Sequence, residues 1–152
     1  MLMVADLLPA AAGEAFERML DERVRRRPVA QILGRRAFWG RNFAVSAAVL
    51  DPRPETETLI ARALEGPVPG SILDLGTGSG ILLVTLLAEW PDAHGLGTDI
   101  DPAALAVAGA NAARHGVAGR AAFRVADLSA RGGGKVMTTA VRPNACQDQT
   151  LL

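Results

Sequence analysis

A glycine-rich turn between a predicted strand and a predicted helix constrains the fold of this chain most strongly. The turn reads Asp74-Leu75-Gly76-Thr77-Gly78-Ser79-Gly80, after the apolar run 71–73 and before the apolar segment 81–88. Glycine lets the backbone adopt a positive φ and approach a ligand closely. Asp99 follows nineteen residues after Gly80, where a second strand should end. A glycine turn followed by such an acid typically holds ribose hydroxyls, so we expect an adenosine-containing cofactor.

The spacing of the glycines indicates which cofactor is bound. A dinucleotide fingerprint, G-x-G-x-x-G, requires glycine at position 81, where this chain has Ile81. A pyrophosphate needs a helix N-terminus directed at it, with close backbone approach. The spacing therefore disfavours NAD, and a dinucleotide-dependent oxidoreductase is the weaker alternative. A glycine turn with no ligand is a further alternative, against which Asp99 argues.

Composition indicates one folded domain in the cytoplasm. The chain has 152 residues, 49% of them hydrophobic, and 16 basic residues balance 16 acidic ones. Cys146 stands alone, which excludes an internal disulfide framework and a thiolate metal site. Asp6 interrupts the short apolar N-terminal run, and no apolar stretch approaches the roughly 18 residues of a membrane helix. We expect a soluble protein with no membrane segment and no metal.

The first 70 residues predict a helix, a hairpin and a second helix. A helix over 14–26 carries an apolar stripe (Phe16, Met19, Leu20 and Val24), which must pack on the domain or on a helical region that this chain lacks. A β-hairpin is predicted over 36–46, with a type II′ turn at Gly40-Arg41. A connecting helix carries Leu59, Ile60, Ala63 and Leu64, and 66–70 is a linker.

From residue 71 the pattern alternates between strand and helix. It predicts strands at 71–75, 94–99 and 121–126, with helices at about 79–90 and 102–115. Asp101-Pro102 is typical of a helix start. Such alternation produces a parallel sheet with right-handed crossovers. We predict no strand after Leu128, so one edge of strand 71–75 should stay unpaired and promote association and poor solubility.

Four segments together resemble HemK/PrmC-type methyltransferases. They are 28–34 (Pro-Val-Ala-Gln-Ile-Leu-Gly), 38–40 (Phe-Trp-Gly), 52–57 (Pro-Arg-Pro-Glu-Thr-Glu) and 74–80. The resemblance covers roughly residues 14–128. Members of that family transfer a methyl group from S-adenosylmethionine to the side-chain nitrogen of the glutamine in the GGQ motif of peptide chain release factors. The implied fold is α/β, a class I S-adenosylmethionine-dependent methyltransferase (Rossmann-like) with an incomplete parallel sheet, preceded by a short helix and a β-hairpin.

The resemblance also implies an organisation and a set of site residues. Residues 1–27 would be a remnant of an N-terminal helical domain, 28–70 the hairpin and connecting helix, 71–128 a partial methyltransferase domain, and 129–152 an irregular tail. The S-adenosylmethionine site would comprise Gly76, Thr77, Gly78, Ser79 and Gly80 beside the methionine moiety, Asp99 on the ribose, and Asp127 and Leu128 beside the adenine. Arg53, Thr56 and Glu57 would shape the pocket entrance, although a helix-start ion pair with no ligand role is an equal reading of Arg53 and Glu57.

Two departures from the family affect activity. Most of its N-terminal helical bundle, which helps recognise the release factor, is missing. Its Asn-Pro-Pro-Tyr motif, which orients the substrate amide, is also absent, and Pro143-Asn144-Ala145-Cys146 does not match it. No catalytic residue can therefore be named, and we expect this chain, as a fragment, to be inactive. The alternatives are a cofactor-binding pseudoenzyme or a fragment of another N-methyltransferase. We interpret residues from about 129 as an out-of-frame or premature tail.

Two other groups of residues have simpler readings. The arginines at 23, 25, 26, 27, 35 and 36 could contact ribosomal RNA or a release factor, but a solvated face is the preferred interpretation, and we expect no direct nucleic-acid binding. His94 at a strand start and His115 at a helix C-terminus, where positive charge is favoured, are interpreted as structural.

Overall fold

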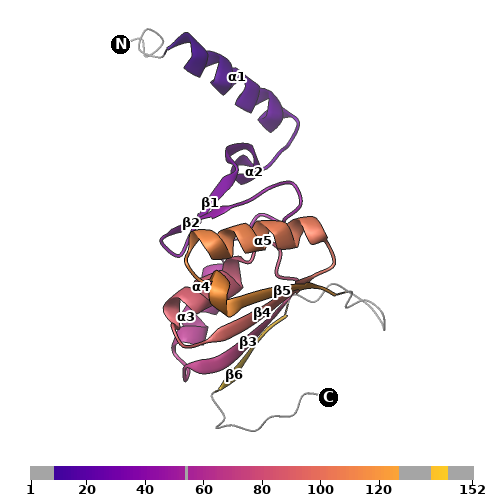
Figure 1. Ribbon diagram of the computed structural model, residues 1–152. Coiled ribbons are helices and arrows are strands. Elements are labelled where there is room, and N and C mark those ends of the chain that lie inside the picture. The colour runs from indigo at the N-terminus through magenta and orange to yellow at the C-terminus, as the bar shows by residue number, and fades with distance from the viewer. Residues whose placement is uncertain (1–8, 54, 127–137, 144–152) are drawn as a thin grey trace.

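A computed structural model describes residues 9–53, 55–126 and 138–143 of the chain. Its centre is a four-stranded sheet of order β5-β4-β3-β6 (Figure 1). Strands β3 (Pro69–Leu75), β4 (His94–Asp99) and β5 (Ala121–Val125) are parallel neighbours, with Leu73 opposite Leu96 and Leu96 opposite Ala122. The three strands predicted from residue 71 onward are therefore confirmed, and with them the α/β class.

Helices α4 (Ile81–Glu89) and α5 (Pro102–Arg114) connect these strands and lie on one side of the sheet (Figure 1). Residues 81–87 of α4 are all buried, which explains why this helix is apolar around its whole circumference. The α5 helix begins as predicted, since the Asp101 side chain accepts the N–H of Ala103 at 2.8 Å. A short 3-10 helix, η2 (Ala118–Arg120), leads into β5.

The guanidinium of Arg120 closes the C-terminal end of α4. It donates to the backbone carbonyls of Leu87, Trp90 and Ala93 at 2.6, 2.9 and 2.7 Å. The last carbonyls of a helix have no partner within the helix, so one forked side chain satisfies several groups at once. Arg120 therefore fixes the turn between α4 and β4 and, through it, the start of the strand that ends at Asp99.

The predicted hairpin forms, but its turn differs from the prediction. Strands β1 (Arg35–Phe38) and β2 (Arg41–Ala44) pair antiparallel with Phe38 opposite Arg41. The two central residues are therefore Trp39 and Gly40, whose φ angles are 47° and 68°. Two positive φ angles define a type I′ turn, so the expected type II′ turn at Gly40-Arg41 is wrong. A bulky side chain at positive φ is strained, and side-chain contacts hold Trp39 there.

Two contacts fasten the hairpin to the domain. The N–H of Trp39 donates to the Glu57 carboxylate at 2.8 Å, and Glu57 lies in the first turn of α3 (Thr56–Leu64). The Arg41 guanidinium pairs with Glu89 of α4 at 2.8 Å. Phe38 and Phe43 of the hairpin and Ile60 of α3 share one buried cluster with the apolar residues of α4. Glu57 is thus a structural tie to the hairpin in the described residues.

The N-terminal helix α1 (Ala10–Val24) projects away from the sheet domain (Figure 1). It is followed by the short helix α2 (Val29–Leu33), which ends at Gly34 with φ 67°. The stripe predicted to pack on the domain is exposed: Phe16 is 59% and Val24 81% accessible. That packing is not made by the described part of the chain. No helix among the described residues combines the length and the apolarity that crossing a membrane would require.

Strand β6 (Thr138–Pro143) corrects the expectation that no strand follows residue 128. It pairs antiparallel with β3, and Thr138 lies opposite Leu75 while Pro143 lies opposite Pro69. The edge of β3 that was expected to be free is therefore paired. A free edge presents a row of unpaired N–H and C=O groups, and the β-branched Thr138, Thr139 and Val141 are suited to that place.

Candidate functional site

The candidate site lies at the carboxyl end of β3, where the glycine turn crosses to α4. Gly76, Gly78 and Gly80 have φ angles of 73°, 55° and 73°. All three positions thus use the left-handed region that glycine enters without strain. Alternating glycines therefore explain the backbone conformation of the turn, and Thr77 and Ser79 between them are buried.

Hydrogen bonds of Thr77 fix the turn to the ends of β3 and β4. The Thr77 hydroxyl donates to the buried carboxylate of Asp74 at 2.7 Å. The Thr77 N–H donates to the carbonyl of Thr98, the penultimate residue of β4, at 2.8 Å. Consequently the turn bends over the end of β4 rather than extending into solvent.

The carboxylate of Asp99 faces the turn. One oxygen accepts the N–H of Gly78 at 2.9 Å and the other accepts the N–H of Asp101 at 3.1 Å. An ionised carboxylate has about four acceptor positions, so each oxygen keeps one after these bonds. Asp99 is partly exposed. It can therefore accept two hydroxyl hydrogens from one ligand without giving up either backbone contact.

The turn is closely packed on the side that faces α5 and open on its outer side. A Cβ on Gly80 would lie 2.9 Å from Cβ of Ala108, and one on Gly97 would lie 2.9 Å from the Phe123 ring. A Cβ on Gly78 would meet no described atom within 4 Å. The turn thus rests directly on α5, and Gly78 is the place where its backbone is open to a ligand.

Sequence reasoning missed Asn111, the polar residue that joins the turn to the hairpin. It is completely buried on α5. Its side-chain amide donates to the carbonyls of Ser79 at 2.9 Å and Ala44 at 3.0 Å, and its oxygen accepts the N–H of Ala44 at 2.7 Å. A signal was present in the sequence, because Asn111 falls between Ala108 and Ala112 on the apolar face of the predicted helix. A polar residue in that position must find partners.

The remaining predicted residues are placed as follows. Asp127 and Leu128 lie outside the described residues. No cluster of three His, Cys, Asp or Glu residues suited to a metal occurs among the residues that are described.

His115 packs against Phe43 with ring centroids 4.5 Å apart, and its Nε2 lies 3.2 Å from the Asn42 carbonyl. Desolvation lowers the pKa of His115 despite the helix end and the Asn42 carbonyl, with Arg41 and Arg114 adding repulsion. The expectation that positive charge is favoured there is therefore wrong.

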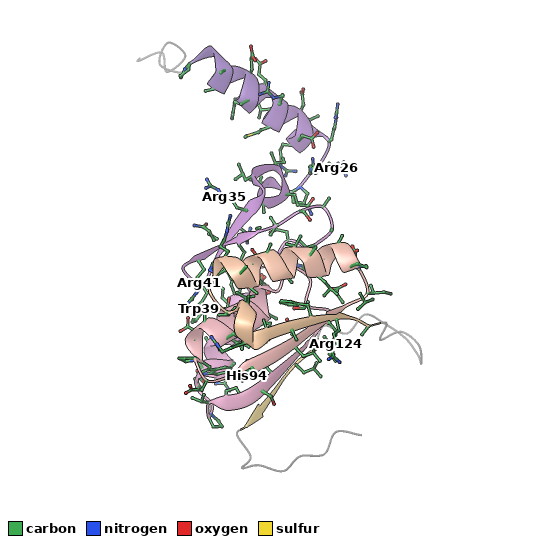
Figure 2. The ribbon with its side chains drawn as sticks, viewed as in Figure 1. Arg26, Arg35, Trp39, Arg41, His94 and Arg124 are labelled. Atoms are coloured by element: carbon green, nitrogen blue, oxygen red, sulfur yellow. The ribbon has the colours of Figure 1, made fainter. Side chains whose placement is uncertain are left out.

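The arginines at the N-terminal end are partly neutralised. Glu22 pairs with Arg25 at 3.6 Å and Arg27 at 2.6 Å, and Arg36 lies 3.6 Å from Asp51. Figure 2 shows Arg26 near the end of α1 and Arg35 at the start of β1. This pattern fits the solvated face preferred from the sequence.

Comparison with known proteins agrees with the fold. Residues 72–134 match the sequence profile of a methyltransferase domain. A Pyrococcus horikoshii protein named as a transferase has a similar structure, with a TM-score of 0.51 and 16% sequence identity. The match covers 61% of this chain and 36% of that protein. That likeness concerns the fold alone. The chain thus has a partial class I methyltransferase fold.

The curated relatives share one name. The release factor glutamine methyltransferase of Cereibacter sphaeroides is 56% identical over 83% of this chain and 45% of its own length. The Rhodospirillum rubrum protein of the same name is 50% identical over 78% of this chain and 37% of its own. The chain is a partial match to the release factor glutamine methyltransferase family. It spans less than half the length of these relatives.

Proposed function

We propose that the described domain is the cofactor-binding part of a release-factor glutamine methyltransferase, and that S-adenosylmethionine lies across residues 76–80 with its ribose on Asp99. The observation that carries this proposal is the Asp99 carboxylate, which faces Gly78 and retains an acceptor position on each oxygen. Two adjacent ribose hydroxyls would complete its hydrogen bonding.

The turn also suits a cofactor without phosphates. Because Gly78 is open on its outer side and φ-positive, a flat or extended ligand can approach its backbone within van der Waals distance. Ile81 opens α4 where a dinucleotide fingerprint needs a third glycine. When bound, S-adenosylmethionine would supply an electrophilic methyl group. The chain's own residues would hold and orient the nucleoside, with Asp127 and Leu128 proposed beside the adenine.

The substrate is proposed from the family rather than from the site. The two relatives are named release factor glutamine methyltransferases, so the partner is proposed to be a peptide chain release factor, modified on the glutamine of its GGQ motif in the cytoplasm. The present sequence has no Asn-Pro-Pro-Tyr segment to orient the amide. Strand β6 runs antiparallel to β3, so Pro143 lies opposite Pro69, at the end of β3 remote from the glycine turn. Loss of substrate orientation removes a large part of catalysis.

Two measurements test the proposal. Calorimetric titration should show binding of S-adenosylhomocysteine and no binding of NAD; tighter binding of NAD would make an oxidoreductase the better assignment. Incubation of the chain with labelled S-adenosylmethionine and a GGQ-containing release factor should give no methylation, with the Cereibacter sphaeroides relative as the positive control. Methylation by this chain would show that the Asn-Pro-Pro-Tyr segment is not required.

A further inference from the structure

Asn111 joins two parts of the molecule that are distant in sequence. Its three hydrogen bonds connect Ser79 in the glycine turn to Ala44 at the end of β2, 32 and 67 residues away. Both amide hydrogens and the oxygen are used, and the side chain is completely buried. Such a group holds its partners in one arrangement, because any rotation would leave buried polar atoms unpaired.

The bond to Ser79 holds the peptide group between Ser79 and Gly80, close to Gly78 in the turn. The Gly78 N–H is held by Asp99 at 2.9 Å, and one residue further the Ser79 carbonyl is held by Asn111 at 2.9 Å. Gly80 then rests on Ala108, which lies one turn before Asn111 on the same face of α5. The outer part of the turn is therefore clamped on both sides of Ser79.

The other end of the Asn111 bridge is a well-fastened hairpin. Trp39 is bonded to Glu57, Arg41 to Glu89, and Phe43 stacks on His115. The three contacts come from α3, α4 and the end of α5. Figure 2 shows Trp39 and Arg41 together where the hairpin meets these helices. The hairpin is thus a rigid support for the side chain that orients Ser79.

We propose that Asn111 is a positioning residue that couples the β1–β2 hairpin to the cofactor turn, so that the hairpin sets the turn's order and its affinity for the adenosyl cofactor. The affinity part rests on the proposed function; the coupling does not. A turn already held in its bound geometry loses less freedom when the ligand binds, and that preorganisation raises affinity.

Hydrogen exchange of the intact chain without ligand tests the coupling. Asn111→Ala should accelerate exchange in the segment 76–80 by about tenfold, the change expected when a buried hydrogen bond of about 1.4 kcal/mol is lost. Leu87→Ala serves as the control, because it removes a completely buried α4 side chain that packs on Gly95 of β4. It should destabilise the whole domain without a selective effect on this segment. Equal acceleration in both variants would overturn the proposal.

Titration with S-adenosylhomocysteine tests the consequence for affinity. The Kd should rise about tenfold in Asn111→Ala and change little in Leu87→Ala when both are measured well below their melting temperatures. An unchanged Kd in Asn111→Ala would refute the affinity part. If the unsubstituted chain does not bind the ligand, the proposed function fails, whereas the exchange measurement still decides the coupling.

Arg41→Met provides the same test if Asn111→Ala does not fold. The substitution removes the ion pair with Glu89 and keeps the apolar part of the side chain, far from the turn in sequence. Because a partly exposed ion pair contributes little, exchange in 76–80 should accelerate only about twofold. Acceleration confined to the hairpin would contradict coupling through Asn111.

Discussion

The carboxylate of Asp99 accepts the backbone N–H of Gly78 at 2.9 Å and so joins the end of β4 to the middle of the glycine turn. The same carboxylate also accepts the N–H of Asp101 at 3.1 Å. A single side chain therefore holds the backbone of the turn while two of its acceptor positions point elsewhere. The proposed ribose contact uses those two positions.

Asp99→Asn should weaken S-adenosylhomocysteine binding roughly 30-fold or more, since an amide cannot accept at both ends and lacks the charge, a difference of about 2 kcal/mol. Asp101→Asn is the matched control, because it makes the same change two residues away and asparagine is an equally good N-cap. Its Kd should stay close to that of the unsubstituted chain. Equal affinities of all three proteins would exclude Asp99 from the site.

Gly80→Ala should destabilise the domain by about 2 kcal/mol or more, because alanine is strained at a φ of 73° and its Cβ would lie 2.9 Å from Cβ of Ala108. Gly109→Ala is the control, since Gly109 lies within α5 and a Cβ there meets nothing within 4 Å. That change should stabilise by about 0.5–1 kcal/mol. Urea unfolding of both variants measures the difference, and a neutral Gly80→Ala would show that the turn does not rest on α5.

Lowering the pH should destabilise the fold through His115. Its pKa is lowered by desolvation from the ordinary value of 6.5, so the unfolded chain binds this proton more readily than the folded chain. The contribution to stability is complete above pH 6.5 and decreases as the pH falls through 6.5 toward the folded-state pKa. His115→Gln should flatten that part of the stability curve. If the substituted and unsubstituted chains lose stability in parallel between pH 7 and pH 5, His115 is not responsible.

Arg120→Met should destabilise the chain by about 2 kcal/mol, because three backbone carbonyls in and just after the last turn of α4 lose their donor. Arg62→Met removes an exposed pair with Glu65 on α3 and should change stability by no more than about 0.5 kcal/mol. Melting temperatures of the two variants compare a partly buried and an exposed arginine directly. A similar small shift in both would mean that the carbonyls are satisfied by solvent.

The exposed stripe on α1 should promote self-association. Phe16, Leu20 and Val24 are 59%, 47% and 81% accessible, and contiguous exposed apolar side chains favour contacts between molecules. Phe16→Ser with Leu20→Ser should lower the sedimentation coefficient at high protein concentration without shifting the melting transition. Unchanged association would show that the α1 stripe is not the surface through which the molecules associate.

The sequence predicted the part of the fold that depends on local signals. Alternating apolar segments gave the strands and helices from residue 71, and Asp101-Pro102 gave the start of α5. Gly76, Gly78 and Gly80 gave the turn, and the parallel connection brings its residues beside the end of β4. These features are local because each depends on a short motif and on the handedness of the connection.

Features that depend on partners distant in sequence were not predicted. The turn of the hairpin is displaced by one residue because Glu57 holds the Trp39 N–H. Strand β6 pairs with the edge of β3, and no hydrophobic periodicity within 138–143 indicates a strand. The pKa of His115 depends first on its burial and then on Asn42, Arg41 and Arg114. The role of Asn111 depends on Ala44 and Ser79. Each of these requires tertiary structure.

A crystal structure of the chain with S-adenosylhomocysteine would test the central claim most directly. The claim predicts both ribose hydroxyls within hydrogen-bond distance of the Asp99 carboxylate and the amino-acid end of the ligand across residues 76–80, with the Gly78 N–H still on Asp99. A ligand bound elsewhere, or a ribose that does not touch Asp99, would contradict it.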